Sequence, residues 1–287
     1  MTDHTIDREG VSAALGAAPD ASRLRATPLA AFGGLVLRDL RVVTAERGKF
    51  LVRTLSQPLL LVFVFAYVFP RIGQSFEASG GRGSFTDVLV PGVVAITVLT
   101  KGIQAVALPL VQDFGYTREI EDRVMAPLPV WAVAVEKIVA GAAQGLVGAL
   151  IVLPLSVVVP AEPVMLRIGW PDLIAVLTLA PVLSSAFGLA LGTNVAPNQV
   201  PLMFSVVILP ITFLGAVYFP WSALGPIPWL QILVLVNPLV YICEGFRMAL
   251  TPQVGHMPAA AIYLAIVGFT VVAGWLGIRG FCRQVLT

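Results

Sequence analysis

The sequence predicts an all-α integral membrane protein with six transmembrane helices, and three observations support this prediction. Hydrophobic residues make up 57% of the chain and charged residues only 12%, against roughly a quarter charged in soluble domains. Six segments are apolar over about the length that a bilayer-spanning helix needs. Basic residues gather on one side of these segments. Because one soluble core of this chain length cannot bury so much apolar surface, lipid must be the solvent for much of it.

The chain divides into a short tail and one transmembrane domain. Residues 1–28 carry too few apolar residues to fold alone and are expected to form a flexible cytoplasmic tail. Residues 29–287 form the transmembrane domain, which begins with an amphipathic segment over 29–49. The predicted spans are 55–69, 88–111, 138–159, 173–195, 200–219 and 259–278.

The segment 29–49 has the pattern of a helix at the membrane surface. Its apolar residues recur at helical spacing, and basic residues occupy the other positions. This pattern predicts a helix that lies flat in the inner headgroup layer with its basic face toward anionic lipid. The alternative is a cytoplasmic amphipathic helix that docks on protein. The apolar set is Phe32, Leu35, Val36, Leu40 and Val43, against Arg38, Asp39, Arg41 and Arg47.

A seventh apolar segment, within 226–250, does not fit a simple span. Asn237 and Pro238 interrupt it, and Glu244 and Arg247 follow. Because a proline and two charges are costly in lipid, we expect a broken, re-entrant hairpin on the extracellular side, buried against protein. If the segment crosses fully instead, the C-terminus lies on the other side. Glu244 and Arg247 are spaced to pair on one helix face, and in an outer lid the pair would also act in gating.

Basic residues set the expected orientation. Six crossings place both termini in the cytoplasm of a cell-membrane protein. The inner side then holds Arg38, Arg41, Arg47, Lys49, Arg53, Arg118, Arg123, Lys137, Arg279 and Arg283, and the outer side holds Arg71, Arg82, Arg167 and Arg247.

Lys101 is the one clear charge near the middle of a predicted span. An ionisable residue at membrane depth indicates a functional site, so Lys101 is expected to face a transport path or an acidic partner such as Glu244. The alternative is that its helix projects into the cytoplasm, which would bring Lys101 closer to water.

The loop after the second span is rich in charge. Residues 118–125 contain good helix formers and a Glu119–Arg123 pair at i,i+4 spacing, and Pro127 and Pro129 end the helix. A short charged helix between two long spans can transmit force to a cytoplasmic partner. The alternative is a solvated loop helix whose charges keep it out of lipid.

From the amphipathic segment onward, the order of these parts resembles the membrane subunit of a type 2 ABC exporter. The likeness includes Pro91-Gly92 at the opening of the second span and the stretch NPLVYICEGFR over 237–247. The resemblance implies a separate ATP-binding cassette subunit that docks on the charged helix, and a second permease copy or a related permease. The residues expected to contact the ATP-binding subunit are Arg118, Glu119, Glu121, Asp122 and Arg123.

The same resemblance implies export of hydrophobic or amphipathic cargo such as a drug, an antibiotic or a lipid. Few fixed charges in the apolar interior favour such cargo over a small ion, and a polysaccharide is the alternative within the family. An ATP-independent transporter is the rival class. It would predict internal repeats or several intramembrane charges, whereas the chain has no evident repeat.

The chain itself is not expected to be an enzyme or to hold a cofactor. The phosphate-binding pattern G-x-x-x-x-G-K-[ST] is missing, since Gly48-Lys49 is followed by Phe50, so ATP would be bound by the partner subunit. His4 and His256 are too isolated to build a metal site. A net charge of +2 gives no indication of nucleic acid as a partner.

Overall fold

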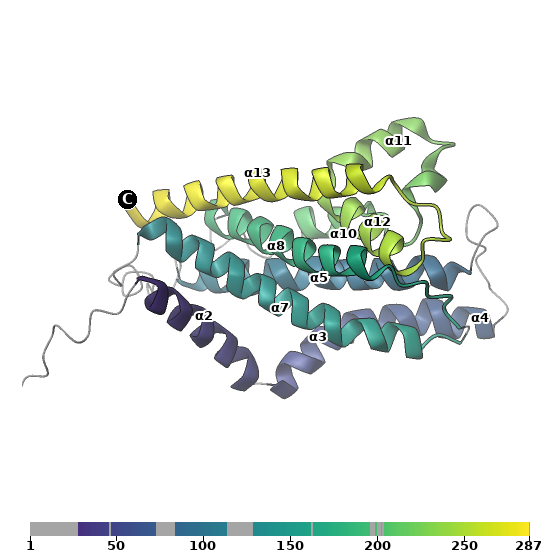
Figure 1. The fold of residues 1–287 in the computed structure, drawn as a ribbon, viewed down its shortest axis with the longest axis horizontal. Helices are drawn as coiled ribbons and strands as arrows, with labels where there is room; N and C mark the ends of the chain where they lie inside the picture. Colours follow the sequence, from purple (N-terminus) through teal and green to yellow (C-terminus); the bar gives the residue numbers. More distant parts are fainter. Residues whose placement is uncertain are drawn as a thin grey trace, which may run out of the picture.

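The computed structural model describes residues 28–45, 47–72, 84–113, 129–161, 163–195, 199, 202 and 204–286. Over these residues the regular elements are helices arranged as a bundle (Figure 1). Five helices are long and apolar enough to cross a membrane: Phe50–Arg71, Phe85–Gln112, Val130–Val158, Trp170–Asn194 and Ala259–Val285. A bent pair of shorter helices adds a sixth candidate. The predicted all-α integral membrane fold is therefore confirmed.

The first span is longer than the predicted 55–69. Helix α2 (Pro28–Ala45) is followed by α3 (Arg47–Val62), which continues through a π-helix (Phe63–Val68) into α4 (Phe69–Arg71). The apolar part alone spans 22 residues, Phe50–Arg71. The helix includes Arg53, because a long basic side chain near a helix end can reach the interface while its backbone stays helical.

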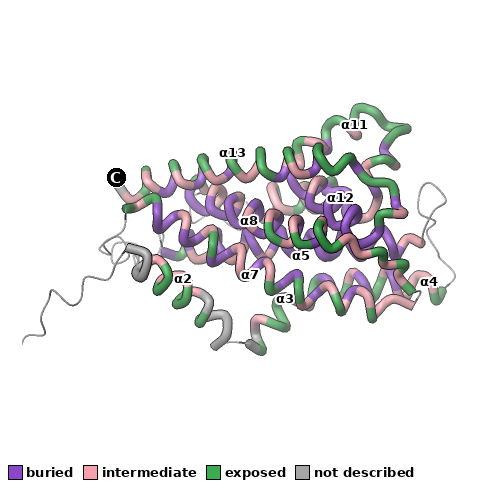
Figure 2. Tube along the Cα trace, in the orientation of Figure 1, coloured by how far each residue is buried: buried purple, intermediate pink, exposed green. Residues whose placement is uncertain are grey.

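Helix α5 (Phe85–Gln112) lies at the centre of the bundle and is buried along most of its length (Figure 2). It packs against α7 (Val130–Val158), α8 (Trp170–Asn194) and α12 (Pro238–Leu250). A capping box begins this helix. The side chain of Ser84 accepts a hydrogen bond from the backbone N–H of Asp87, and the carboxylate of Asp87 accepts one from the backbone N–H of Ser84.

Small residues set the close approach of α5 and α8. A Cβ added to Gly188 would lie 2.9 Å from the Cα of Ile103, and one added to Gly192 would lie 3.0 Å from the Cα of Ala107. These glycines therefore pack within one chain, where small side chains let helix backbones approach closely in lipid.

The fifth predicted span, 200–219, is helical over a shorter stretch in its described part. A π-helix (Phe204–Ile208) leads into α10 (Leu209–Phe213), which ends six residues before the predicted boundary. Turns follow over 214–219, and Ala216 takes a positive φ of 56°. The chain leaves the helix here because the carbonyl groups of Ala216 and Val217 turn toward the side chain of Arg247. Apolar composition alone could not indicate this end.

The late hairpin bends as its Asn-Pro break predicted. A short 3₁₀ helix (Trp221–Leu224) precedes α11 (Pro228–Leu233), which continues as a 3₁₀ turn (Val234–Val236). The axis then turns by 98° into α12. Asn237 holds the bend, since its side-chain oxygen accepts from Leu239 N at 2.9 Å and its Nδ2 donates to Ile211 O at 2.7 Å.

The hairpin lies at one end of the bundle, and α2 and the end of α13 (Ala259–Leu286) lie at the other (Figure 1). The labels α11 and α12 stand at the end where α13 begins, whereas α2 and the C-terminus lie at the other end (Figure 1). Both limbs of the hairpin thus occupy the same half of the bundle, which is the arrangement of a re-entrant segment. Helix α12 is almost wholly buried, whereas α11 is exposed (Figure 2).

Candidate functional site

A polar cleft opens where α2, α3, α5 and α7 meet. Its volume is about 420 Å³, and a smaller recess of about 90 Å³ adjoins it between α3 and α5. Arg53, Lys101 and Gln104 line both spaces. The larger cleft mixes charged and amide groups with an apolar wall. Its remaining lining includes Asp39, Lys137 and Gln144 on the polar side and Phe50, Leu108 and Pro109 on the apolar side.

The side chain of Lys101, on α5, lies beside the start of the first span. Its Nζ donates a hydrogen bond of 2.7 Å to the backbone oxygen of Arg53. Arg53 belongs to the first turn of the span Phe50–Arg71, so the ammonium group sits at the level where that span begins. This geometry fits the alternative in which α5 projects beyond the membrane core. Helix rise places Lys101 about 24 Å from Phe85 along the axis.

Glu244 is not the partner of Lys101, contrary to that expectation. The carboxylate of Glu244 is fully buried and takes its hydrogen bonds from other groups. The aliphatic stem of Lys101 packs over Gly148 on α7, where an added Cβ would lie 3.4 Å from the Lys101 Cγ. The side chain is thus laid along the small-residue face of α7 toward the cleft.

An ion pair joins α2 to α7 at the cleft wall. Lys137 Nζ contacts Asp39 Oδ2, and their side chains are only 6% and 22% exposed. A second carboxylate, Glu136 Oε2, lies 3.7 Å from the same ammonium group. Helix α2 therefore docks on protein through its acidic residue. The contact with α7 agrees with the alternative in which this helix docks on protein. The basic residues Arg38 and Arg41 lie on the exposed side of α2.

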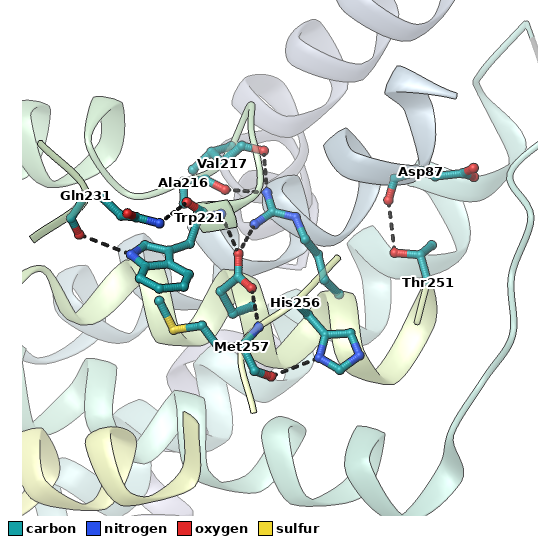
Figure 3. A network of polar contacts seen from close by, with 10 residues as sticks. Asp87, Ala216, Val217, Trp221, Gln231, Thr251, His256 and Met257 are labelled. Atoms are coloured by element: carbon teal, nitrogen blue, oxygen red, sulfur yellow. Dashed lines mark hydrogen bonds and ion pairs between the residues drawn. The ribbon is translucent and has the colours of Figure 1, made fainter. Parts of the chain in front are cut away.

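Glu244 and Arg247 form a buried ion pair within α12. Arg247 Nη1 donates to Glu244 Oε1 at 3.0 Å, and both side chains are 0% exposed. The two carboxylate oxygens accept further bonds of 2.9 Å from the backbone N–H groups of Trp221 and Met257. Figure 3 shows how these groups converge from three separate segments.

Arg247 also ties α12 to the turns that follow α10. Its Nη2 donates to the backbone oxygens of Ala216 and, at 3.2 Å, of Val217. Since both side chains are fully buried and bonded to backbone groups of other segments, the pair braces the hairpin; Arg247 Nε, which is also buried, has no hydrogen-bond partner among the described residues. Sequence spacing alone predicted the pair, but not that Trp221 and Met257 complete it.

A second tie fastens the hairpin to the start of α5. Thr251 Oγ1 donates to the backbone oxygen of Asp87 at 3.0 Å (Figure 3). The Asp87 carboxylate in turn accepts from the N–H of Met165 at 2.9 Å and of Ser84 at 3.1 Å. Sequence reasoning missed Asp87. The S-x-x-D pattern of a capping box at Ser84 was the signal that could have found it.

The residues expected to contact an ATP-binding subunit, Arg118, Glu119, Glu121, Asp122 and Arg123, fall in 114–128, outside the described residues. The helices that flank this segment, α5 and α7, pack against each other and frame the cleft. In the part of the chain that the structure describes, no group of three or more His, Cys, Asp or Glu side chains could hold a metal ion. Cys243 and Cys282 are free thiols.

These features define a multi-span membrane permease with a polar cleft at one end and a braced hairpin at the other. Residues 31–251 match the family described as ABC-2 type transporter, so the chain belongs to this family. The chain is 27% identical over 223 residues to the inner membrane transport permease YadH of Escherichia coli strain K12, which covers 77% of this chain and 84% of that protein. YadH of Escherichia coli O157:H7 and of Shigella flexneri give the same values.

The family assignment fixes the broad role of the chain. It is the membrane subunit of an ABC transporter, not itself the ATPase, and a multi-pass inner membrane protein. The resemblance to type 2 ABC permeases that the sequence suggested is confirmed.

Proposed function

We propose that this chain is the transmembrane subunit of an ATP-driven exporter that moves hydrophobic or amphipathic cargo out of the cytoplasm or the inner leaflet. A separate ATP-binding cassette subunit supplies the energy, and a second copy of the chain or a related permease completes the pathway. The observation that carries this proposal is the match to the ABC-2 type transporter family over 31–251. The cleft of this chain, which has both polar and apolar walls, suits amphipathic cargo such as a drug, an antibiotic or a lipid.

Coupling would run through the segment that joins α5 to α7. A partner docked on Arg118, Glu119, Glu121, Asp122 and Arg123 would move the ends of these two helices when it closes on ATP. Because α5 and α7 also carry Lys101 and Lys137 on the cleft wall, such a movement would change the shape of the cleft. The termini would then be cytoplasmic, and the hairpin braced by Glu244 and Arg247 would be the outer lid.

Co-purification tests the proposal. The chain is co-expressed with ATP-binding cassette subunits encoded near it, and the complexes are assayed for ATPase activity. Replacing Glu119, Glu121 and Asp122 together by alanine should weaken the complex and its ATPase activity. Replacing Asp3, Asp7 and Glu9 in the tail removes the same charge and serves as the matched control.

Two results would overturn the proposal. One is the lack of any ATPase partner together with transport that proceeds in vesicles without ATP, which favours an ATP-independent transporter. The other is an equal loss of binding in the tail variant and the loop variant, which would mean that net charge and not docking sets the affinity. Transport of fluorescent drugs, lipids and polysaccharide precursors into inverted vesicles then separates the classes of cargo.

A further inference from the structure

In the cleft between α2, α3, α5 and α7, two of the three cations, Arg53 and Lys101, form no ion pair with a carboxylate of the described residues. Among the described residues, Lys101 donates only to a backbone oxygen, and Arg53 forms no ion pair. The third cation on the cleft wall, Lys137, is already paired with Asp39. Two cations held together beside a partly apolar wall repel each other, and an anion between them would remove this cost.

The neutral groups of the cleft suit a phosphate. Gln104 on α5 and Gln144 on α7 line the same space and present amide N–H donors, which bind an oxyanion without adding charge. Arg53 contributes a planar fork of donors, which matches phosphate oxygens better than any other side chain. The hydroxyl groups of Thr97 and Thr100 in the adjoining recess donate to carbonyl groups of their own helix and are not available.

An exposed apolar face of the first span continues from this polar space. The face presents Leu60, Leu61, Val64 and Phe65, and Gln57 lies both on this face and in the recess next to Lys101. Leu60 is 64% exposed, so this face of α3 is open to the surroundings. A free phosphate would use only the cationic end, whereas a molecule with a phosphate and a long hydrocarbon chain would fill both parts.

We propose that the cleft holds the phosphate headgroup of an anionic membrane lipid, bound by Arg53, Lys101, Gln104 and Gln144, with an acyl chain along the exposed apolar face of the first span. The shared chemistry is a phosphate ester, and the apolar face next to the cleft assigns it to a lipid. The proposal does not depend on ATP-driven export, since it concerns binding by the membrane subunit alone.

The test measures lipid binding by the full chain in a neutral detergent with native mass spectrometry. Phosphatidylglycerol is titrated against phosphatidylcholine with the same acyl chains, and glycerol 3-phosphate is added as the soluble phosphate ester. The wild-type chain should bind its first phosphatidylglycerol at least about tenfold more tightly than phosphatidylcholine. Each of Arg53→Gln and Lys101→Gln should weaken that binding roughly fivefold, because a basic residue near an anionic headgroup contributes on that scale.

Matched variants separate the site from general attraction. Arg279→Gln removes an exposed cation that stacks on Trp275 in α13 and should change the binding by less than about twofold. Lys101→Arg keeps the charge and should keep the binding. Gln144→Leu keeps both cations and the side-chain volume, so it tests the amide in a chain with unchanged charge. We expect roughly a threefold loss for this variant.

Three results would overturn the proposal. Equal binding of the two lipids would show that no anion site exists. A loss with Arg279→Gln as large as that with Lys101→Gln would show that the charge acts from anywhere on the surface. Displacement of the lipid by glycerol 3-phosphate at equal concentration would show that the acyl chain contributes nothing and that the site takes a soluble phosphate ester.

Discussion

Replacing Glu244 by glutamine tests whether the hairpin is held by its buried ion pair. The change keeps the shape of the side chain but removes its charge, and it directs an amide N–H₂ toward a backbone N–H of Trp221 or Met257. Arg247 would stay fully buried without its carboxylate. Breaking a buried pair by removing one partner costs about 3–5 kcal/mol, since the remaining charge is uncompensated. We expect a loss of that size in the free energy of unfolding.

A double-mutant cycle isolates the ion pair from the other contacts of the two residues. The four proteins are the wild type, Glu244→Gln, Arg247→Met and the double variant, and their unfolding is measured in mixed detergent micelles. Because the double variant leaves no unpaired charge, it should be more stable than either single variant. Tyr263→Phe is the control, since it removes one hydrogen bond of 2.7 Å to Asp172 on a different pair of helices and should cost about 1 kcal/mol.

The reasoning would be refuted by additive effects. If Glu244→Gln and Arg247→Met each cost less than about 1 kcal/mol, or if their effects simply add in the double variant, the buried pair does not brace the hairpin. The carboxylate would then be kept for contact with cargo or for gating, and transport measurements on the same variants would be the next step.

Three further changes test the packing that surrounds the cleft and the hairpin. Gly188→Ala should destabilise the protein by about 1–3 kcal/mol, because the new methyl group would overlap the backbone of α5. The control Gly268→Ala adds its methyl group to open space and should be neutral. Thermal unfolding compares the two variants. Asn237→Ala removes the cap of α12 and should cost about 1–2 kcal/mol in the same assay, and an unchanged midpoint would contradict the capping role. Asp39→Asn should speed hydrogen exchange in α2 several-fold while α8 stays protected, since it breaks the ion pair to Lys137; equal protection of α2 in both proteins would show that apolar contacts alone dock it.

The sequence predicted the elements whose signals are local to the chain. Apolar length indicated the spans, and the Asn237-Pro238 break predicted the bend that the structure places between α11 and α12. The spacing of Glu244 and Arg247 predicted their pairing. Each of these features depends on neighbouring residues, so a single sequence contains the information.

Other predictions failed because their outcome depends on how the helices pack. Glu244 was expected as a candidate partner of Lys101, but Lys101 donates a hydrogen bond to the backbone oxygen of Arg53, on a different helix and 48 positions away. The end of α10 at Phe213 is decided by the carbonyl groups that turn toward Arg247. Neither contact has a signature within a window of sequence.

The sequence was sufficient to show that lipid is the solvent for much of the chain, to locate most of its long apolar helices and to indicate which segment breaks. These properties depend on composition and on the length of each apolar segment, so each segment and its neighbouring residues are enough to indicate them. Which polar groups meet depends on how the helices pack: packing forms the cleft that gathers Arg53, Lys101 and Lys137, and the network around Glu244. In a low-dielectric interior a charge must find its partners across helices, and the positions of those partners are fixed by small residues such as Gly188 that set how closely the helices approach.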